Sequence, residues 1–253
     1  MNIKEINTFI KLLAEESSNV IRKYFRTSIN VESKSDLSPV TIADKLAEEK
    51  MRSIIQNEFP DHGIIGEEFG ADRSDAEYVW VLDPIDGTKS FISGALSFGT
   101  LIALLQNGKP ILGVINHPIL NELLIGDNKI CLLNDSKVKI RDCDSISNAT
   151  LLSTDHLNIS KYQNKNGFEN LISKVKMYRN WGDCYGYYLL ATGYVDIMID
   201  PIMSIWDSMA LVPIINGAGG IITDYQGKDP TIGNSIVASS PEIHADIIKL
   251  LNN

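Results

Sequence analysis

The chain has 253 residues, of which 44% are apolar and 22% charged, and this composition excludes a disordered tail protein. With 23 basic and 32 acidic side chains the formal net charge is −9 at pH 7, so neither a nucleic-acid backbone nor an anionic membrane surface is an expected partner. Three cysteines without a paired spacing, no secretory signal and no apolar run of roughly 20 residues predict a cytoplasmic protein.

Two amphipathic helices are predicted at the start of the chain. Apolar residues recur every three or four positions from Ile3 to Tyr24, which indicates a long helix with one buried face. After a polar stretch from Glu32 to Pro39, a second helix is predicted from about Thr41 to Glu58. Its first residues, Thr41 and Asp44, have the spacing of an N-terminal capping box.

Strands follow the second helix. Apolar and β-branched residues are dense in four segments: Tyr78–Leu82, Gly99–Gln106, Ile111–Ile115 and Glu122–Ile125. Between the second and third of these segments, Asn107 and Gly108 form the sequence of a two-residue hairpin turn. The first half is therefore predicted to contain a mostly antiparallel sheet.

Strands and helices alternate in the second half, which is typical of an α/β arrangement. The predicted elements are strands at Thr150–Ser153, Val195–Ile199, Gly220–Thr223 and Ile236–Ala238, and helices at Gly167–Val175, Tyr185–Ala191, Ile205–Asn216 and Pro241–Leu250. A charged and polar stretch from Ile140 to Asn148 separates the halves, so we predict an N-terminal α+β domain over residues 1–145 and a C-terminal α/β domain over residues 146–253. The polar segment from Asn158 to Asn170 is predicted to be a solvated loop, with a place at the border of a pocket as the alternative.

Acidic residues cluster at three predicted strand ends or helix starts: Gly66-Glu67-Glu68, Asp83-Pro84-Ile85-Asp86-Gly87-Thr88 and Trp206-Asp207. In the second cluster Pro84 is expected to end the strand, so that the carboxylates of Asp83 and Asp86 converge on one turn. Carboxylate oxygens suit hard cations such as Mg²⁺, which binds substrate phosphate in its remaining positions. Gly87 and Thr88 add backbone and hydroxyl donors for that phosphate. The pattern predicts a metal site for phosphate chemistry.

The motif DPIDGTKSF, preceded by GEE and followed by WDSMALVPIINGAGG, resembles the inositol monophosphatase family of Mg²⁺-dependent, lithium-sensitive phosphatases. The resemblance covers nearly the whole chain. It implies an α/β fold class with an α+β N-terminal half, arranged as a layered αβαβα fold. It also implies a homodimer, lithium inhibition and two or three Mg²⁺ ions in each active site.

The metal ligands that the resemblance implies map onto five residues: Glu67, Asp83, Ile85 through its carbonyl, Asp86 and Asp207. In this scheme Asp83 bridges the first two ions. Glu67 and Thr88 orient the attacking water, and Asp44 holds Thr88 in place. One ion lowers the pKa of the bound water and the other stabilises the leaving oxygen, so no covalent enzyme intermediate is required.

A narrower resemblance concerns the substrate. The strings WGDCYGY and ATGYVDIMIDPIMSIWD resemble the histidinol-phosphate phosphatase branch of the family. Histidinol phosphate carries an ammonium group and an imidazole, which Asp183 and Asp200 can bind through charge-assisted hydrogen bonds. We therefore expect an enzyme of histidine biosynthesis that hydrolyses histidinol phosphate, with Gly87, Thr88, Asp183 and Asp200 in contact with the substrate.

Other interpretations of the same residues are open. Inositol 1-phosphate is the alternative substrate, and a non-catalytic binding or regulatory protein of the same fold is the alternative from another class. Hydrolysis of 3′-phosphoadenosine 5′-phosphate would require a basic cluster, which the motifs lack. Asp44 with Thr41, and Asp207 with Ser204, also fit capping boxes, a role compatible with binding. Cys184 is expected to be a packing residue rather than a nucleophile.

Overall fold

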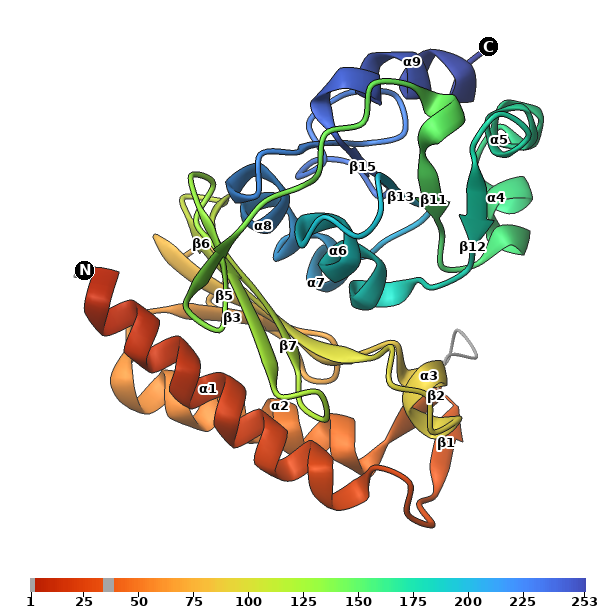
Figure 1. Cartoon of the computed structure of the whole chain (residues 1–253). Coiled ribbons are helices and arrows are strands. Elements are labelled where there is room, and N and C mark those ends of the chain that lie inside the picture. The colour runs from red at the N-terminus through yellow and green to blue at the C-terminus, as the bar shows by residue number, and fades with distance from the viewer. Residues whose placement is uncertain (1–2, 34–38) are drawn as a thin grey trace.

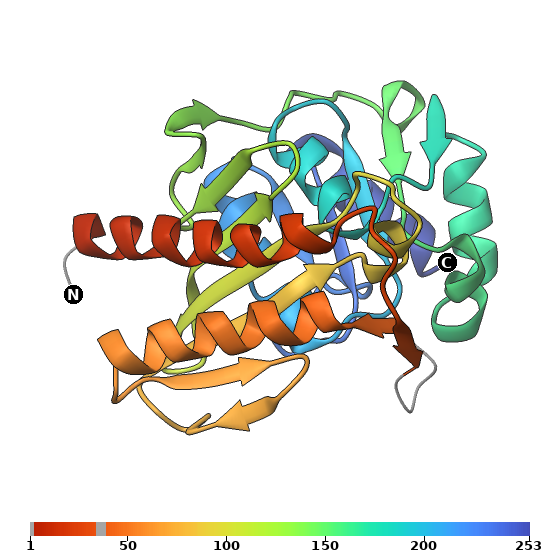
Figure 2. The same cartoon turned by 90° about the horizontal axis from the view of Figure 1, so that it is seen from below.

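Two helices cover one face of the larger sheet in the computed structural model of the chain, which describes residues 3–33 and 39–253. α1 (Ile3–Tyr24) and α2 (Ile42–Glu58) run side by side across this face (Figures 1 and 2). Their apolar sides meet Trp80 of the sheet in one buried cluster. Both predicted helices are confirmed. Residues 34–38 of the predicted polar stretch lie outside the described residues.

The larger sheet has eight strands in the order β10-β9-β8-β7-β6-β5-β3-β4. Their bounds are β3 (Gly63–Gly66), β4 (Gly70–Asp72), β5 (Tyr78–Asp86), β6 (Gly99–Gln106), β7 (Lys109–His117), β8 (Glu122–Gly126), β9 (Cys131–Leu133) and β10 (Ser136–Val138). Only β3 and β5 are parallel neighbours among these described strands, so the mostly antiparallel sheet is confirmed. Asn107 and Gly108 both have positive φ, as the predicted hairpin turn requires.

Strand β5 does not end at Pro84, and that expectation was wrong. The strand continues to Asp86 through a bulge, in which Asp83 pairs with Leu101 but Asp86 pairs with Gly99. A bulge tolerates proline because the residue inside it does not donate to the ladder. The bulge places both aspartates at one end of a central strand.

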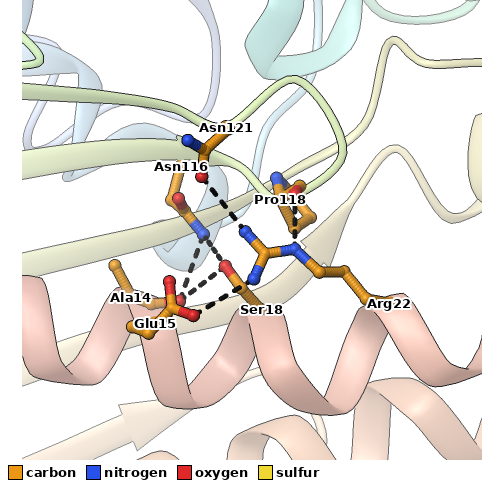
Figure 3. Close-up of polar contacts among 7 residues, drawn as sticks. All are labelled: Ala14, Glu15, Ser18, Arg22, Asn116, Pro118 and Asn121. Atoms are coloured by element: carbon orange, nitrogen blue, oxygen red, sulfur yellow. Dashed lines mark hydrogen bonds and ion pairs between the residues drawn. The ribbon is translucent and has the colours of Figure 1, made fainter.

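Polar contacts from α1 support this end of the sheet. Ser18 Oγ accepts a hydrogen bond of 2.9 Å from Asn116 Nδ2, beside the contacts of Arg22 with Pro118 and Glu15 (Figure 3). The preceding residue, Ser17, has its Oγ 3.2 Å from Thr100 Oγ1, which donates to the carbonyl oxygen of Pro84 at 2.8 Å. The helix is thereby tied to the bulge.

The smaller sheet has five strands in the order β12-β11-β13-β15-β14. Their bounds are β11 (Thr150–Leu152), β12 (Met177–Arg179), β13 (Ile197–Asp200), β14 (Ile221–Thr223) and β15 (Ile236–Ser239). α4 (His156–Tyr162), α5 (Lys165–Ile172) and α9 (Pro241–Leu251) pack on its outer face. The short elements β1 (Val31–Ser33), β2 (Pro39–Thr41) and η1 (Ile146–Asn148) lie outside the two larger sheets.

Three further helices lie between the two sheets: α6 (Asp183–Ala191), α7 (Ile205–Ser208) and α8 (Leu211–Gly217) (Figure 1). Val81 of β5, Ile214 of α8 and Met198 of β13 belong to one buried apolar cluster that joins both sheets. The resulting order is helices, sheet, helices, sheet, helices, which confirms the layered αβαβα fold. The division into domains at residues 145 and 146 stays a prediction.

Two predictions in the second half were wrong. The predicted helix Ile205–Asn216 is divided into α7 and α8, because Pro213 has no N–H to bond the carbonyl of Met209. The predicted loop Asn158–Asn170 is largely helical, since the side chains of Asp155 and Asn164 cap α4 and α5. No helix within the described ranges is long and apolar enough to cross a membrane.

Candidate active site

Three aspartates from distant parts of the chain converge at the centre of the layers. Asp83 and Asp86 come from the β5 bulge and Asp207 from the first turn of α7, and each places one carboxylate oxygen within 4.8 Å of the other two. The Asp207 carboxylate also accepts the Ser204 N–H at 2.7 Å, so the predicted capping box is present. Asp207 therefore caps α7 and belongs to the aspartate cluster at the same time.

The aspartate cluster is electrostatically unbalanced. Burial raises the pKa of Asp83 well above its usual range, and the charges of Glu67, Asp86 and Asp207 raise it further. Burial also raises the pKa of Asp207 to about 7. Among the described residues none of the three aspartates takes part in an ion pair. One buried and two half-buried carboxylates without an ion-pair partner fit a hard divalent cation.

Glu67 lies in the turn between β3 and β4 and lines the same cleft, where its side chain hydrogen-bonds Asp83. The turn is held by Glu48, a buried residue that the sequence did not single out. Its carboxylate accepts the N–H groups of Glu68 and Phe69 at 2.8 and 3.2 Å and pairs with Arg52. The only sequence signal for this arrangement is the Glu48–Arg52 spacing of four residues.

Thr88 begins the short helix α3 (Thr88–Ile92) after Gly87, whose φ is 83°. The Thr88 hydroxyl has two acceptors, the Ile85 carbonyl at 3.1 Å and Asp44 Oδ1 at 3.5 Å. The other Asp44 oxygen accepts the Thr41 N–H and hydroxyl, which confirms the capping box. Asp44 thus lies beside Thr88, but Thr88 is closer to Ile85.

Asp183 belongs to the C-terminal half of the chain, and its side chain lies against Gly87 of the N-terminal half. A Cβ atom added to Gly87 would lie 2.9 Å from Asp183 Oδ2, and the positive φ of Gly87 also favours glycine there. Ser90 donates to the same oxygen at 3.2 Å, and the Asp183 N–H donates to Thr154 Oγ1 at 2.8 Å. Burial, with the charge of Asp200, raises the pKa of Asp183 to about 6.

Asp200, at the end of β13, lies in a side chamber that shares Asp86, Asp183 and Asp207 with the main cleft. Its side chain is buried, and its two oxygens accept the Thr154 N–H and the Tyr187 hydroxyl, each at 3.0 Å. It lines this side chamber of about 130 Å³ but not the main cleft. The geometry makes Asp200 a support for Thr154, and its predicted contact with substrate stays a prediction.

The main cleft has a volume of about 460 Å³ and includes most of the predicted residues. Asn158 lies in the cleft lining, as the alternative interpretation of its segment expected, and eight further lining residues were missed from the sequence: Pro39, Lys89, Ser90, Ser97, Thr154, Asp155, Asn180 and Gly182. Cys184 is buried, and its backbone N–H donates to Asp86, as fits a packing residue. Of the missed residues, only Asp155 carried a local signal, the helix cap that precedes α4.

A layered αβαβα fold with a partly buried acidic cluster between its sheets fits the class of metal-dependent phosphatases, hydrolases of phosphoric monoesters. A family model described as "Inositol monophosphatase family" matches residues 2–253, and the chain belongs to this family.

The chain is similar to several proteins over nearly its whole length. It is 46% identical to the bifunctional phosphatase IMPL2, chloroplastic, of Arabidopsis thaliana, over 94% of this chain and 72% of that protein. It is 38% identical to a histidinol-phosphatase of Chlorobaculum parvum, over 95% and 94% of the two chains. The solved inositol monophosphatase of Zymomonas mobilis matches with a TM-score of 0.89 and 35% identity, over 100% of both chains.

Proposed function

We propose that the protein is a Mg²⁺-dependent phosphatase that acts on histidinol phosphate. The observation that carries this proposal is the position of Asp183, whose carboxylate lies against Gly87 and places a negative charge beside the expected phosphate. A cationic leaving group suits that charge, whereas a neutral polyol does not require it. The similarity to a protein named histidinol-phosphatase supports the same substrate.

The cation would be held by five residues: Glu67, Asp83, the carbonyl of Ile85, Asp86 and Asp207. When bound, Mg²⁺ supplies acidity to a water molecule and positive charge opposite the leaving oxygen. The hydroxyl of Thr88 and the carboxylate of Glu67 orient the water, and the Thr88 hydroxyl is held in turn by the Ile85 carbonyl and Asp44. Gly87 and Thr88 receive the phosphate, and Asp183 binds the cationic part of the alcohol.

Inositol 1-phosphate is the second candidate substrate, because the chain matches the Zymomonas mobilis inositol monophosphatase over its full length. We also propose, from the resemblance of the motifs, a homodimer and inhibition by Li⁺. A sedimentation run that gives a monomer at micromolar concentration would contradict the dimer. A location in the cytoplasm stays a prediction, since one relative is named chloroplastic.

The decisive experiment measures Mg²⁺-dependent phosphate release from histidinol phosphate and from inositol 1-phosphate under the same conditions. We expect a kcat/KM for histidinol phosphate at least about tenfold higher, as one charge-assisted contact provides. The reverse preference would retain the phosphatase and exclude the proposed substrate. Protein that remains inactive on both esters, and that binds no Mg²⁺, would support the non-catalytic alternative.

A further inference from the structure

The side chain of Asp183 is fixed by a short chain of hydroxyl groups from the opposite side of the cleft. Ser97 Oγ donates to Ser90 Oγ at 3.1 Å, and Ser90 Oγ donates to Asp183 Oδ2 at 3.2 Å. Ser90 belongs to α3 and Asp183 to α6, so this chain joins two elements that lie far apart in the sequence. All three residues line the cleft.

The backbone of Asp183 is constrained as well. Its φ is 51°, in the left-handed region that residues other than glycine rarely occupy. The Thr154 hydroxyl accepts its N–H at 2.8 Å, and Asp200 in turn accepts the Thr154 N–H at 3.0 Å. A non-glycine residue held in this region indicates that the surroundings determine its position.

One oxygen of the carboxylate is left for a ligand. Oδ2 accepts the Ser90 hydroxyl and lies against Gly87, whereas Oδ1 has no hydrogen-bond partner in the part of the chain that the structure describes. Gly87 and Thr88 are the residues proposed to receive phosphate, so the carboxylate lies next to the ester group of a bound substrate.

We propose that Ser90, supported by Ser97, is a positioning residue that fixes Asp183 to bind an ammonium group on the carbon next to the ester carbon. The inference rests on the proposed function and extends it to a substrate class, the 2-ammonioalkyl phosphates. In histidinol phosphate the ammonium group occupies this position, and the imidazole is attached through a methylene group to the same carbon. Binding by Asp183 therefore does not need the imidazole, and a smaller ester of this class is a substrate.

The test compares two esters of equal size, O-phosphoethanolamine and propyl phosphate, in which an ammonium group replaces a methyl group. For the wild-type protein we expect kcat/KM to be about tenfold higher for O-phosphoethanolamine, through KM rather than kcat. In Ser90→Ala we expect the ratio of the two kcat/KM values to fall about fivefold or more, since a hydrogen bond to a charged group is lost. Any loss common to both esters cancels in this ratio.

Three further variants serve as controls. Ser97→Ala should lower the ratio by less than Ser90→Ala, because Ser97 acts through Ser90. Ser90→Thr keeps the hydroxyl and should retain the ratio. Ser93→Ala makes the same change in an exposed serine of the same segment, whose hydroxyl has no hydrogen bond among the described residues, and should leave the ratio unaltered.

The outcomes separate the two levels of the proposal. If the wild-type protein prefers histidinol phosphate to inositol 1-phosphate but does not prefer O-phosphoethanolamine to propyl phosphate, the proposed function stands and this inference is wrong. If Ser90→Ala and Ser93→Ala change the ratio equally, Ser90 does not position Asp183. If the wild-type protein does not prefer histidinol phosphate, the proposed function itself fails.

Discussion

The two sides of the cleft are built on different supports. On one side, Asp83 and Asp86 belong to β5, a central strand that is packed on both faces and bulged between these residues. On the other side, Asp183 and Asp207 lie in the first turns of helices, where hydrogen bonds from neighbouring residues set their direction. The strand side brings the carboxylates of Asp83 and Asp86 together. Substitutions on the helix side leave the sheet intact. We infer that substrate choice depends on Asp183 of the helix side, whereas Asp207 of the same side completes the proposed cation site with the two strand aspartates.

The largest effect is expected from Asp83→Asn. Removing this carboxylate should lower Mg²⁺-dependent phosphate release by about 10³-fold or more, as expected when a metal ligand of a catalytic site is lost. The metal-free protein should not be destabilised at pH 8, because burial already disfavours the charged form of Asp83. Phosphate release and thermal unfolding in EDTA measure the two effects. Asp75→Asn, at an exposed position, is the matched control, and retained activity in Asp83→Asn would refute the metal assignment.

Asp183→Ser should have the next largest effect, restricted to substrate choice. We expect kcat/KM for histidinol phosphate to fall roughly 10- to 100-fold, the range for losing a charge-assisted hydrogen bond. The value for inositol 1-phosphate should fall much less. Equal losses on both esters would contradict the assignment of substrate choice to Asp183.

Protons should compete with the cation. The pKa of Asp207 is raised to about 7 in the metal-free fold, above the usual carboxyl range, so the folded state binds a proton more tightly than the unfolded chain does. This group therefore disfavours the metal-free fold as pH rises from about 4 to about 7, and cation binding reverses the effect. We expect apparent Mg²⁺ affinity to fall about tenfold from pH 8 to pH 6, one pH unit below that pKa. Calorimetric titration measures the affinity, and Asp207→Asn should weaken this dependence; a pH-independent affinity would contradict the prediction.

The smallest effect is expected from a support of the strand side. Thr100 is buried and donates to the carbonyl oxygen of Pro84 inside the bulge. Thr100→Val keeps the shape of the side chain but leaves that oxygen without its donor, at a cost of about 1–2 kcal/mol in the free energy of unfolding. Denaturant unfolding measures the change. Thr27→Val, at an exposed hydroxyl, is the control and should cost less than Thr100→Val.

Two buried histidines add a separate dependence on pH at the level of the whole fold. Burial lowers the pKa of His117 and His244 to about 4, below the value of the unfolded chain. Stability from these groups is therefore complete above about pH 6.5 and is lost as pH falls toward 4. Comparing unfolding with and without Mg²⁺ at each pH separates this effect from that of the aspartates.

Much of the fold follows from local patterns. The apolar spacing in α1, the Asn107-Gly108 turn and the capping pair Thr41 and Asp44 each act over a few residues, and the structure confirms them. The failures have different causes: Pro213 and the caps Asp155 and Asn164 are local signals, whereas the position of Pro84 has none. Pro84 remains in a strand because β6 pairs on both sides of the bulge, which no signal in the local sequence indicates.

The family, the phosphatase class and two of the three clustered aspartates follow from the sequence alone, because the contiguous motif DPIDGT carries Asp83 and Asp86 at a spacing that covalent geometry fixes. Which of the second-half residues reach that motif depends on the three-dimensional packing. This packing brought Asp207 and Asp183 to the β5 bulge, placed Ser90 against Asp183 and left Asp200 behind Thr154. These relations depend on the packing of two sheets around the central helices, and such contacts between residues distant in sequence have no local signature.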